Sequence, residues 1–282
     1  MKSYRVPLWS TEALVLEEGN PGDPAVLFLH GLGSGARAWE ELMPPLARKG
    51  FRCLAIDLPG MGDTPPPKDL PFPYPGPHLE AFLAQLWDAL HLRHLRGVVG
   101  WSLGGGIALH MGRLYPHHVE KLVLAAPAGL GREVAWGLRL IGLPGLGQRF
   151  LRTPIPQLPE GDMIFLPKEL ALQPVPRAFV ERHLEMMNHP WYGETQLQIM
   201  RESRVLWQGQ KTISQDVDPG SLAQPVLLFW GREDAILPSY QGERAIKKLK
   251  RGVLHILSPC GHCLPVEFPN VFLRETAAFL KG

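Results

Sequence analysis

The chain has 282 residues, of which 45% are hydrophobic and 20% are charged, and its formal net charge is +2. These values are ordinary for a folded domain and exclude intrinsic disorder. The nearly balanced charge also argues against a nucleic-acid-binding protein, which would have a strongly basic surface. The apolar runs are strand-sized, and the N-terminal residues lack the features of a signal peptide. We therefore expect a globular protein without a membrane span, located in the cytoplasm.

The first half of the chain alternates between short apolar runs and segments with helical periodicity. The expected strands cover 13–19, 25–30, 51–60, 96–102 and 119–127, and the expected helices cover 38–50, 78–92 and 104–116. Several of the strands are continuously apolar, as in strands buried on both faces. Repeated strand–helix–strand units predict an α/β fold with a mostly parallel central sheet covered by helices on both faces.

The alternation stops between about Gly129 and Gln224, where the sequence is helical in character and no buried strand is evident. It then resumes, and the expected elements are strands at 225–231 and 252–258 and helices at 239–250 and 271–280. We therefore predict one core domain formed by residues 1–128 and 225–282. A helical lid, or cap, is predicted as an insertion at 129–224.

The predicted cap is rich in large apolar side chains. These are Trp136, Phe150, Met163, Phe165, Met186, Met187, Trp191, Tyr192, Met200 and Trp207. We expect most of them to pack the cap helices against the sheet, and some to line an apolar pocket for an acyl or aryl group. No cationic cluster in this segment marks an anionic substrate.

The segment GWSLGG (100–105) ends an expected strand and opens an expected helix. It matches the pattern G-x-S-x-G, in which a serine occupies a sharp, strained turn with its hydroxyl exposed above the sheet. Gly100 and Gly104 fit this pattern because a side chain at either position would collide with the tight turn. A glycine-rich connection without a catalytic role is the alternative. The strand before Ser102 and the helix after it favour a nucleophile.

A second glycine-rich turn, LHGLG, also follows an expected strand. His30, Gly31 and Gly33 are compatible with a simple flexible turn, in which His30 has a structural role. The functional interpretation is a loop whose backbone N–H at Leu32 points at a developing oxyanion together with the N–H of Leu103. Removing one such donor typically costs ~10²–10³ in rate.

Taken together, these segments resemble the α/β-hydrolase fold family over nearly the whole chain. HGLG, DLPGMGDT, GWSLGG, WGREDAILP and CGHCLPVEFP occur in the family's order, each at the end of an expected strand. The resemblance implies a nucleophile at Ser102, an acid at Asp234 and a histidine at His262, in the order typical of the fold. Glu233 and, more distantly, Glu133 are competitors for the acid. The family's spacing after the strand's glycine favours Asp234.

Two positions in DLPGMGDT depart from the family's usual residues. Met61 stands where many relatives have histidine, and Thr64 stands where serine is usual. Both positions are mainly structural, so the hydrolase interpretation holds. Substrate analogies that depend on this loop are weakened.

The segment CGHC (260–263) matches the sequence motif of a redox-active dithiol and could also be part of a zinc site. A dithiol of that kind belongs early in a thioredoxin fold, whereas here only one helix is expected to follow. Zinc needs about four ligands, and Cys260, Cys263, His262 and His255 give poor geometry for it. We expect both cysteines to pack around a catalytic His262 without a chemical role of their own. No metal and no cofactor is predicted.

The serine at position 102 restricts the types of reaction that the protein could catalyse. Relatives that attack saturated carbon have aspartate there, whereas a serine hydroxyl activated by histidine suits a carbonyl carbon. We therefore predict a serine hydrolase of carboxylesterase type that cleaves esters of small to medium apolar substrates through an acyl-enzyme on Ser102. The expected partner is a small-molecule ester, with no nucleic acid, and the sequence leaves the oligomeric state open.

Two alternatives remain at this point. A C–C bond hydrolase acting on ring-cleavage products would use the same triad, and the segments WGRED and CGH resemble those enzymes as well. Relatives of that kind often have G-N-S where this chain has Gly100-Trp101-Ser102, which favours an esterase. A catalytically silent receptor for a small ligand is the alternative from another class, and the intact Ser, Asp and His argue against it.

Overall fold

The computed structural model describes residues 1–72, 78–135, 161–202 and 217–282. Its centre is an eight-stranded sheet with the order β1-β2-β4-β3-β5-β6-β9-β10. The strands are β1 (Lys2–Leu8), β2 (Thr11–Glu18), β3 (Ala25–Leu29), β4 (Arg52–Ile56), β5 (Gly97–Trp101), β6 (Leu122–Ala125), β9 (Val226–Gly231) and β10 (Gly252–Leu257). The pairings β1–β2 and β2–β4 are antiparallel and the remaining pairings in this sheet are parallel. The predicted mostly parallel α/β sheet is therefore confirmed.

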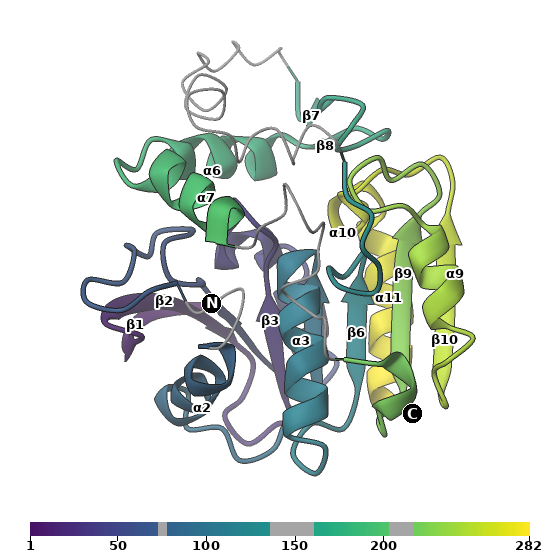
Figure 1. Ribbon diagram of the computed structural model, residues 1–282, viewed down its shortest axis with the longest axis horizontal. Coiled ribbons are helices and arrows are strands. Elements are labelled where there is room, and N and C mark those ends of the chain that lie inside the picture. The colour runs from purple at the N-terminus through teal and green to yellow at the C-terminus, as the bar shows by residue number, and fades with distance from the viewer. Residues whose placement is uncertain (73–77, 136–160, 203–216) are drawn as a thin grey trace.

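Helices cover both faces of this sheet (Figure 1). They are α1 (Met43–Ala47), α2 (Leu79–Ala89), α3 (Leu103–Leu114), α9 (Tyr240–Ala245), α10 (Leu264–Glu267) and α11 (Pro269–Lys281), with short 3₁₀ turns η1 (Ala36–Trp39) and η2 (Pro219–Ser221). Successive side chains of a strand point to opposite faces, so a strand buried on both sides supplies two cores. Leu27 and Leu29 of β3 join the core beneath α2 and α3. Val26 and Phe28 join the core beneath α1 and α11.

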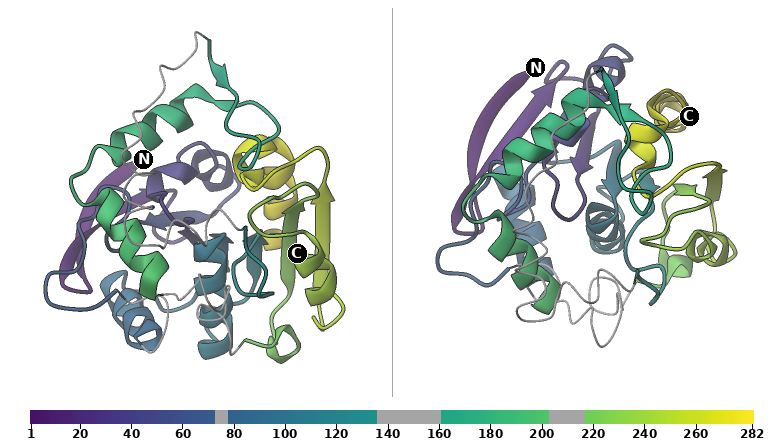
Figure 2. Two further views of the ribbon diagram at one scale, coloured as in Figure 1. Left: turned by 45° about the horizontal axis from the view of Figure 1, so that its top comes forward. Right: turned by 90° about the horizontal axis from the view of Figure 1, so that it is seen from above.

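The segment that interrupts the strand–helix alternation lies over one end of the sheet. Its described elements are β7 (Met163–Ile164), β8 (Val175–Pro176), α6 (Arg177–Met187) and α7 (Tyr192–Glu202). Figures 1 and 2 show these elements stacked above the strand ends. We call the described residues 161–202 the cap. The antiparallel β7–β8 pair was not expected from the sequence, because each strand has only two residues.

Two further elements differ from the sequence-based expectation. The helix expected at 38–50 is divided into η1 and α1, because Pro44 and Pro45 lack the N–H groups that a continuous helix would need there. Strand β1 was not predicted. It contains Pro7 and an irregular burial pattern, both compatible with its place at the edge of the sheet.

No helix within the described residues is both long and apolar enough to cross a membrane.

Candidate active site

Ser102 lies at the sharp turn between β5 and α3. Its backbone has φ 52° and ψ −115°, a conformation that is unfavourable for a residue with a side chain and must be held by its surroundings. Two glycines let the turn pack closely. A Cβ atom at Gly100 would lie 2.5 Å from the Gly104 carbonyl oxygen, and one at Gly104 would overlap the Leu29 carbonyl oxygen. The turn therefore requires glycine at both positions of the G-x-S-x-G pattern.

His262 and Asp234 come from the loops after β10 and β9, and their side chains are in contact. The distance between His262 Nδ1 and Asp234 Oδ2 is 2.8 Å, and both side chains are almost completely buried. The other carboxylate oxygen of Asp234 accepts hydrogen bonds from the backbone N–H groups of Ile236 (2.8 Å) and Leu237 (2.9 Å). The carboxylate is thus fixed by its own loop and can orient the imidazole ring.

The two competing acids do not contact His262. Glu233 is turned toward the loop that precedes the histidine, where its carboxylate accepts from Ser258 Oγ (2.6 Å) and from the backbone N–H of Cys260 (2.9 Å). Glu133 forms an ion pair with Arg244 at 3.2 Å. Of the three carboxylates considered from the sequence, the structure brings only Asp234 to the histidine.

Ser102 and His262 line one cavity at the end of the sheet. The indole Nε1 of Trp101 donates to the carbonyl oxygen of His262 at 2.9 Å, which ties the serine turn to the histidine loop. No hydrogen bond links the Ser102 hydroxyl to the imidazole within the described residues. Catalytic hydrogen bonds in ligand-free sites are often long and tighten only when substrate binds.

The backbone around Leu32 and Leu103 has the features of an oxyanion site. Leu32 lines the same cavity as Ser102, and Leu103 is the first residue of α3, where a helix leaves its N–H groups without intrahelical partners. Neither N–H donates to another group in the described part of the chain. Gly31 lets the loop approach Ser102, because a Cβ there would lie 3.3 Å from Ser102 Cβ. Gly33 has φ +70°, which favours glycine.

His30 is a structural histidine beneath this loop. Its Nε2 accepts from the backbone N–H of Leu58 at 3.0 Å, so the proton is on Nδ1, which donates to the Gly31 carbonyl oxygen at 2.8 Å. The ring is fully buried, and this burial lowers the pKa of His30 to about 4. A neutral imidazole therefore holds the loop in place at neutral pH.

The loop that contains Met61 and Thr64 is held by a buried carboxylate. Asp57 accepts from the backbone N–H groups of Ala36 (2.6 Å) and Asp63 (2.7 Å) and from Thr64 Oγ1 (3.2 Å). Burial raises the pKa of Asp57 to about 7. Met61 is fully buried in the core beneath α2 and α3. Both residues that depart from the family's usual pattern are thus enclosed in the loop's interior.

Cys260 and Cys263 are buried free thiols, and burial raises the pKa of each well above that of an exposed thiol. A raised pKa makes the reactive thiolate scarce, which is unlike a redox-active pair. No group of His, Cys, Asp and Glu side chains suited to a metal ion occurs among the described residues.

Sequence reasoning missed Glu267, a buried carboxylate one turn beyond the histidine. It accepts from the backbone N–H of Gly261 (3.0 Å), and also from those of Leu172 (2.8 Å) and Gln173 (3.1 Å) in the cap. A signal was present, since an acid in an otherwise apolar helical segment needs partners when buried. Glu267 joins the histidine loop to the cap.

The same connection is made by backbone groups. The Leu170 carbonyl oxygen accepts from the N–H groups of His262 (2.7 Å) and Cys263 (3.1 Å). We call residues 167–173 the strap. It lies against Gly261, where a Cβ would come within 2.6 Å of the Leu170 carbonyl oxygen. The strap and Glu267 together fix the histidine loop from the cap side.

Among the described cap residues that line the cavity, all but one histidine are apolar. They are Leu166, Leu170, Phe179, Val180 and His183. Of the large apolar residues named from the sequence, Trp136, Phe150 and Trp207 lie outside the described residues. The others are described and do not line this cavity, to which α6 contributes Phe179, Val180 and His183 instead. Met163 and Phe165 are exposed.

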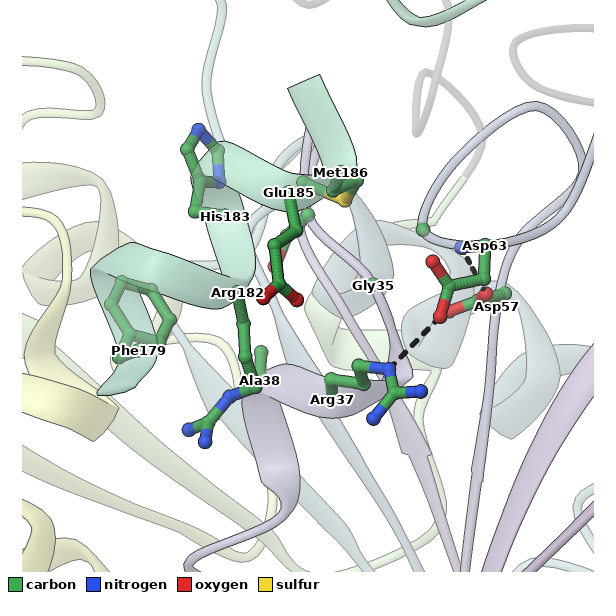
Figure 3. A pocket seen from close by; sticks show the side chains of 12 residues that line it. Gly35, Arg37, Ala38, Asp57, Asp63, Phe179, Arg182, His183, Glu185 and Met186 are labelled. Carbon is green, nitrogen blue, oxygen red and sulfur yellow. Dashed lines mark hydrogen bonds and ion pairs between the residues drawn. The ribbon is translucent and has the colours of Figure 1, made fainter. Parts of the chain in front are cut away.

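A second pocket lies beside this cavity, between α6 and the loops after β3 and β4 (Figure 3). It shares Ser34, Phe179 and His183 with the cavity above Ser102. Its opposite wall is polar, with Arg37 and Asp63 joined by a hydrogen-bonded ion pair of 2.9 Å. In Figure 3 the ring of His183 projects from α6 away from this ion pair. The histidine therefore stands at the boundary between the two spaces.

The family described as alpha/beta hydrolase fold matches residues 24–269. The 2-hydroxy-6-oxo-2,4-heptadienoate hydrolase of Pseudomonas putida is 28% identical over 275 residues, which cover 95% of this chain and 92% of that protein. The 2-hydroxy-6-oxo-6-phenylhexa-2,4-dienoate hydrolase of Comamonas testosteroni is 26% identical over 265 residues, with coverage of 91% and 87%.

Among solved structures, the chain is similar to a serine hydrolase from the polyaromatic hydrocarbon-degrading bacterium Cycloclasticus zankles. The TM-score is 0.77 at 22% identity, and the match covers 100% of this chain and 98% of the other. Likeness at this level of identity is likeness of fold.

Proposed function

This chain belongs to the alpha/beta hydrolase fold family, and from that premise we propose that it is a serine hydrolase with Ser102 as nucleophile, His262 as general base and Asp234 as the acid that orients it. The observation that carries the proposal is the 2.8 Å contact between His262 Nδ1 and Asp234 Oδ2, beside a cavity that also contains the strained Ser102 turn. A carboxylate, an imidazole and a hydroxyl in this order are the parts of an acyl-transfer site.

The proposed reaction begins with attack of Ser102 Oγ on a carbonyl carbon, while His262 Nε2 takes the hydroxyl proton. Asp234 keeps the proton of Nδ1 in place and stabilises the imidazolium that forms. The N–H groups of Leu32 and Leu103 receive the negative charge that develops on the carbonyl oxygen. His262 then gives its proton to the leaving alcohol, and it later deprotonates the water that cleaves the acyl-enzyme and restores Ser102.

We propose an ester of a small to medium apolar acid as the substrate class. The supporting observation is the lining of the cavity, in which Leu166, Leu170, Phe179 and Val180 face the nucleophile and the described lining residues include neither lysine nor arginine. An apolar wall favours an uncharged acyl or aryl group. The cap that supplies this wall acts in the proposal as a lid that selects the substrate.

A second candidate is hydrolysis of a carbon–carbon bond in a ring-cleavage product. It is favoured by the relatives from Pseudomonas putida and Comamonas testosteroni, whose names describe hydrolases of 2-hydroxy-6-oxo-dienoates. Those compounds are carboxylates, and binding one would require a cation or several hydrogen-bond donors near its carboxylate. The triad would serve either reaction, since both begin at a carbonyl carbon.

Two measurements test the proposal. A fluorophosphonate probe should label Ser102 in the purified protein, and Ser102→Ala should abolish labelling. A protein that binds small molecules without turnover would neither react with the probe nor hydrolyse an ester, and that result would contradict the hydrolase proposal. Parallel assays with a 4-nitrophenyl ester and a 2-hydroxy-6-oxo-dienoate then compare the two reactions. A kcat/KM larger for the dienoate than for every ester in a graded acyl series would replace the first candidate by the second.

A further inference from the structure

His183 is a polar side chain in the cap wall of the cavity above Ser102. It lies on α6 one turn after Phe179, and it lines the cavity that contains Ser102 and His262. The other described cap residues that line this cavity are Leu166, Leu170, Phe179 and Val180, all of them apolar. His183 is thus the one hydrogen-bonding side chain that the described part of the cap presents to the nucleophile.

The ring of His183 makes no hydrogen bond and no ion pair with any described residue. Its neighbour is Tyr192 of α7, whose ring meets it edge-on with centroids 6.3 Å apart. Tyr192 is already engaged, because its hydroxyl donates to the Gly33 carbonyl oxygen at 3.2 Å. The His183 side chain is half-buried, so its ring nitrogens remain available to hydrogen-bond an oxygen atom of a ligand that enters the cavity.

The environment of His183 also determines its charge. Burial lowers the pKa of His183, and no carboxylate contacts the ring to oppose this effect. The ring is therefore a neutral imidazole at neutral pH, with one N–H donor and one nitrogen acceptor. Such a group matches a hydroxyl or a ketone oxygen better than it matches a carboxylate, which binds most strongly to cations.

We propose that His183 is a specificity-determining residue that hydrogen-bonds an uncharged oxygen of the substrate, a ketone or hydroxyl on the portion that lies against α6. This inference rests on the proposed hydrolase function and narrows its substrate class from a plain apolar ester to an oxygenated, uncharged one. A site that hydrogen-bonds a substrate oxygen discriminates against analogues that lack this oxygen, because the hydrogen bond is then lost.

The test compares 4-nitrophenyl hexanoate with the 4-oxohexanoate, the 5-oxohexanoate and the hydrogen adipate, which ends in a carboxylate. The variants are His183→Leu and His183→Phe, which remove the hydrogen bond, and His183→Gln, which retains a donor and an acceptor. His189→Leu is the matched control, because His189 is also a cap histidine but pairs with Asp63 at 3.0 Å and does not line the cavity above Ser102. Fluorophosphonate labelling shows which variants keep an intact nucleophile.

The parent protein and His189→Leu should prefer one of the two keto esters over hexanoate by roughly 3- to 30-fold in kcat/KM. In His183→Leu and His183→Phe this preference should disappear, measured within each variant as the kcat/KM ratio of the keto ester to hexanoate, and His183→Gln should retain part of it. The inference is overturned if a labelled, active parent shows no preference, if the preference survives in a folded apolar variant, or if the adipate is the best substrate. If the parent neither labels nor hydrolyses any ester, the proposed function fails and this inference fails with it.

Discussion

The two sides of the cavity above Ser102 are built in different ways. On the sheet side, the residues that shape the site are held by buried hydrogen bonds, such as those of His30, Asp57 and Asp234. On the cap side, the strap and Tyr192 also form hydrogen bonds with the core, but α6 itself is joined to it by apolar packing and by partly exposed ion pairs, among them Arg182–Glu41 at 3.2 Å. In the function proposed above, the sheet side sets the chemistry, and α6, which is joined to the core in part by exposed ion pairs, selects the substrate.

The largest effect should come from Ser102 and His262, the proposed nucleophile and base on the sheet side. We expect Ser102→Ala and His262→Ala each to lower kcat by ~10⁴–10⁶, because the two residues act as one unit. The double variant should be little worse than either single one, and thermal unfolding should remain cooperative in all three. Steady-state kinetics and calorimetry would check this. Additive losses in the double variant would contradict the shared role.

The next effect should separate the two neighbouring carboxylates. Asp234→Asn should lower kcat by about 10³–10⁴, since the amide disturbs the orientation and tautomer of His262 without removing the base. Glu233→Gln is the matched control and should cost less than about tenfold, because it loosens hydrogen bonds to Ser258 and Cys260 only. If Glu233→Gln is the more damaging change, the acid has been assigned to the wrong residue.

A moderate effect should appear in the pH dependence of stability. His30 has a folded-state pKa of about 4, below its ordinary value of 6.5, so its contribution is present above 6.5 and is lost as the pH falls toward 4. We expect this residue to remove about 2 kcal/mol from the free energy of unfolding between pH 7 and pH 5. Urea titrations of the parent and of His30→Gln would measure it. Equal slopes in both proteins would show that His30 is not the source.

The smallest effect should come from the cap. Arg182→Met keeps the apolar stem of the side chain and removes the ion pairs with Glu40 and Glu41. We expect the free energy of unfolding to fall by less than about 1 kcal/mol, and the difference to shrink at high salt. Chemical denaturation at two salt concentrations provides the measurement. A loss of several kcal/mol would mean that the cap is fixed as firmly as the sheet side.

This division also explains what could be predicted from the sequence. The turn at Ser102, the loop after β3 and the sheet itself follow from local rules, such as glycine at crowded positions and apolar runs in buried strands. The contact between Asp234 and His262 required the resemblance to the family, because the two residues are brought together by neighbouring strands. Which cap side chains face the nucleophile depends on the rotation of α6, and the apolar pattern alone did not single out His183.

Glu267 illustrates a further limit. Its partners Gly261, Leu172 and Gln173 are backbone groups, and backbone groups carry no signature in the sequence. The prediction of one helix at 38–50 was wrong for a reason that is visible in the sequence, since two adjacent prolines interrupt this segment. Long-range partnerships to the main chain are therefore the part of the site that most needs a structure.

The strap has a consequence for the construction of chimeric enzymes. Residues 167–173 precede α6 and belong by position to the inserted segment, yet their carbonyl and N–H groups bind the histidine loop and Glu267. Exchanging the cap between relatives to transfer substrate preference would separate these partners if the junction preceded residue 167. A junction placed after Gln173 would keep the host's strap with the host's histidine and transfer α6, which lines the cavity above Ser102. The modular unit of this protein is therefore smaller than the insertion that the sequence delimits.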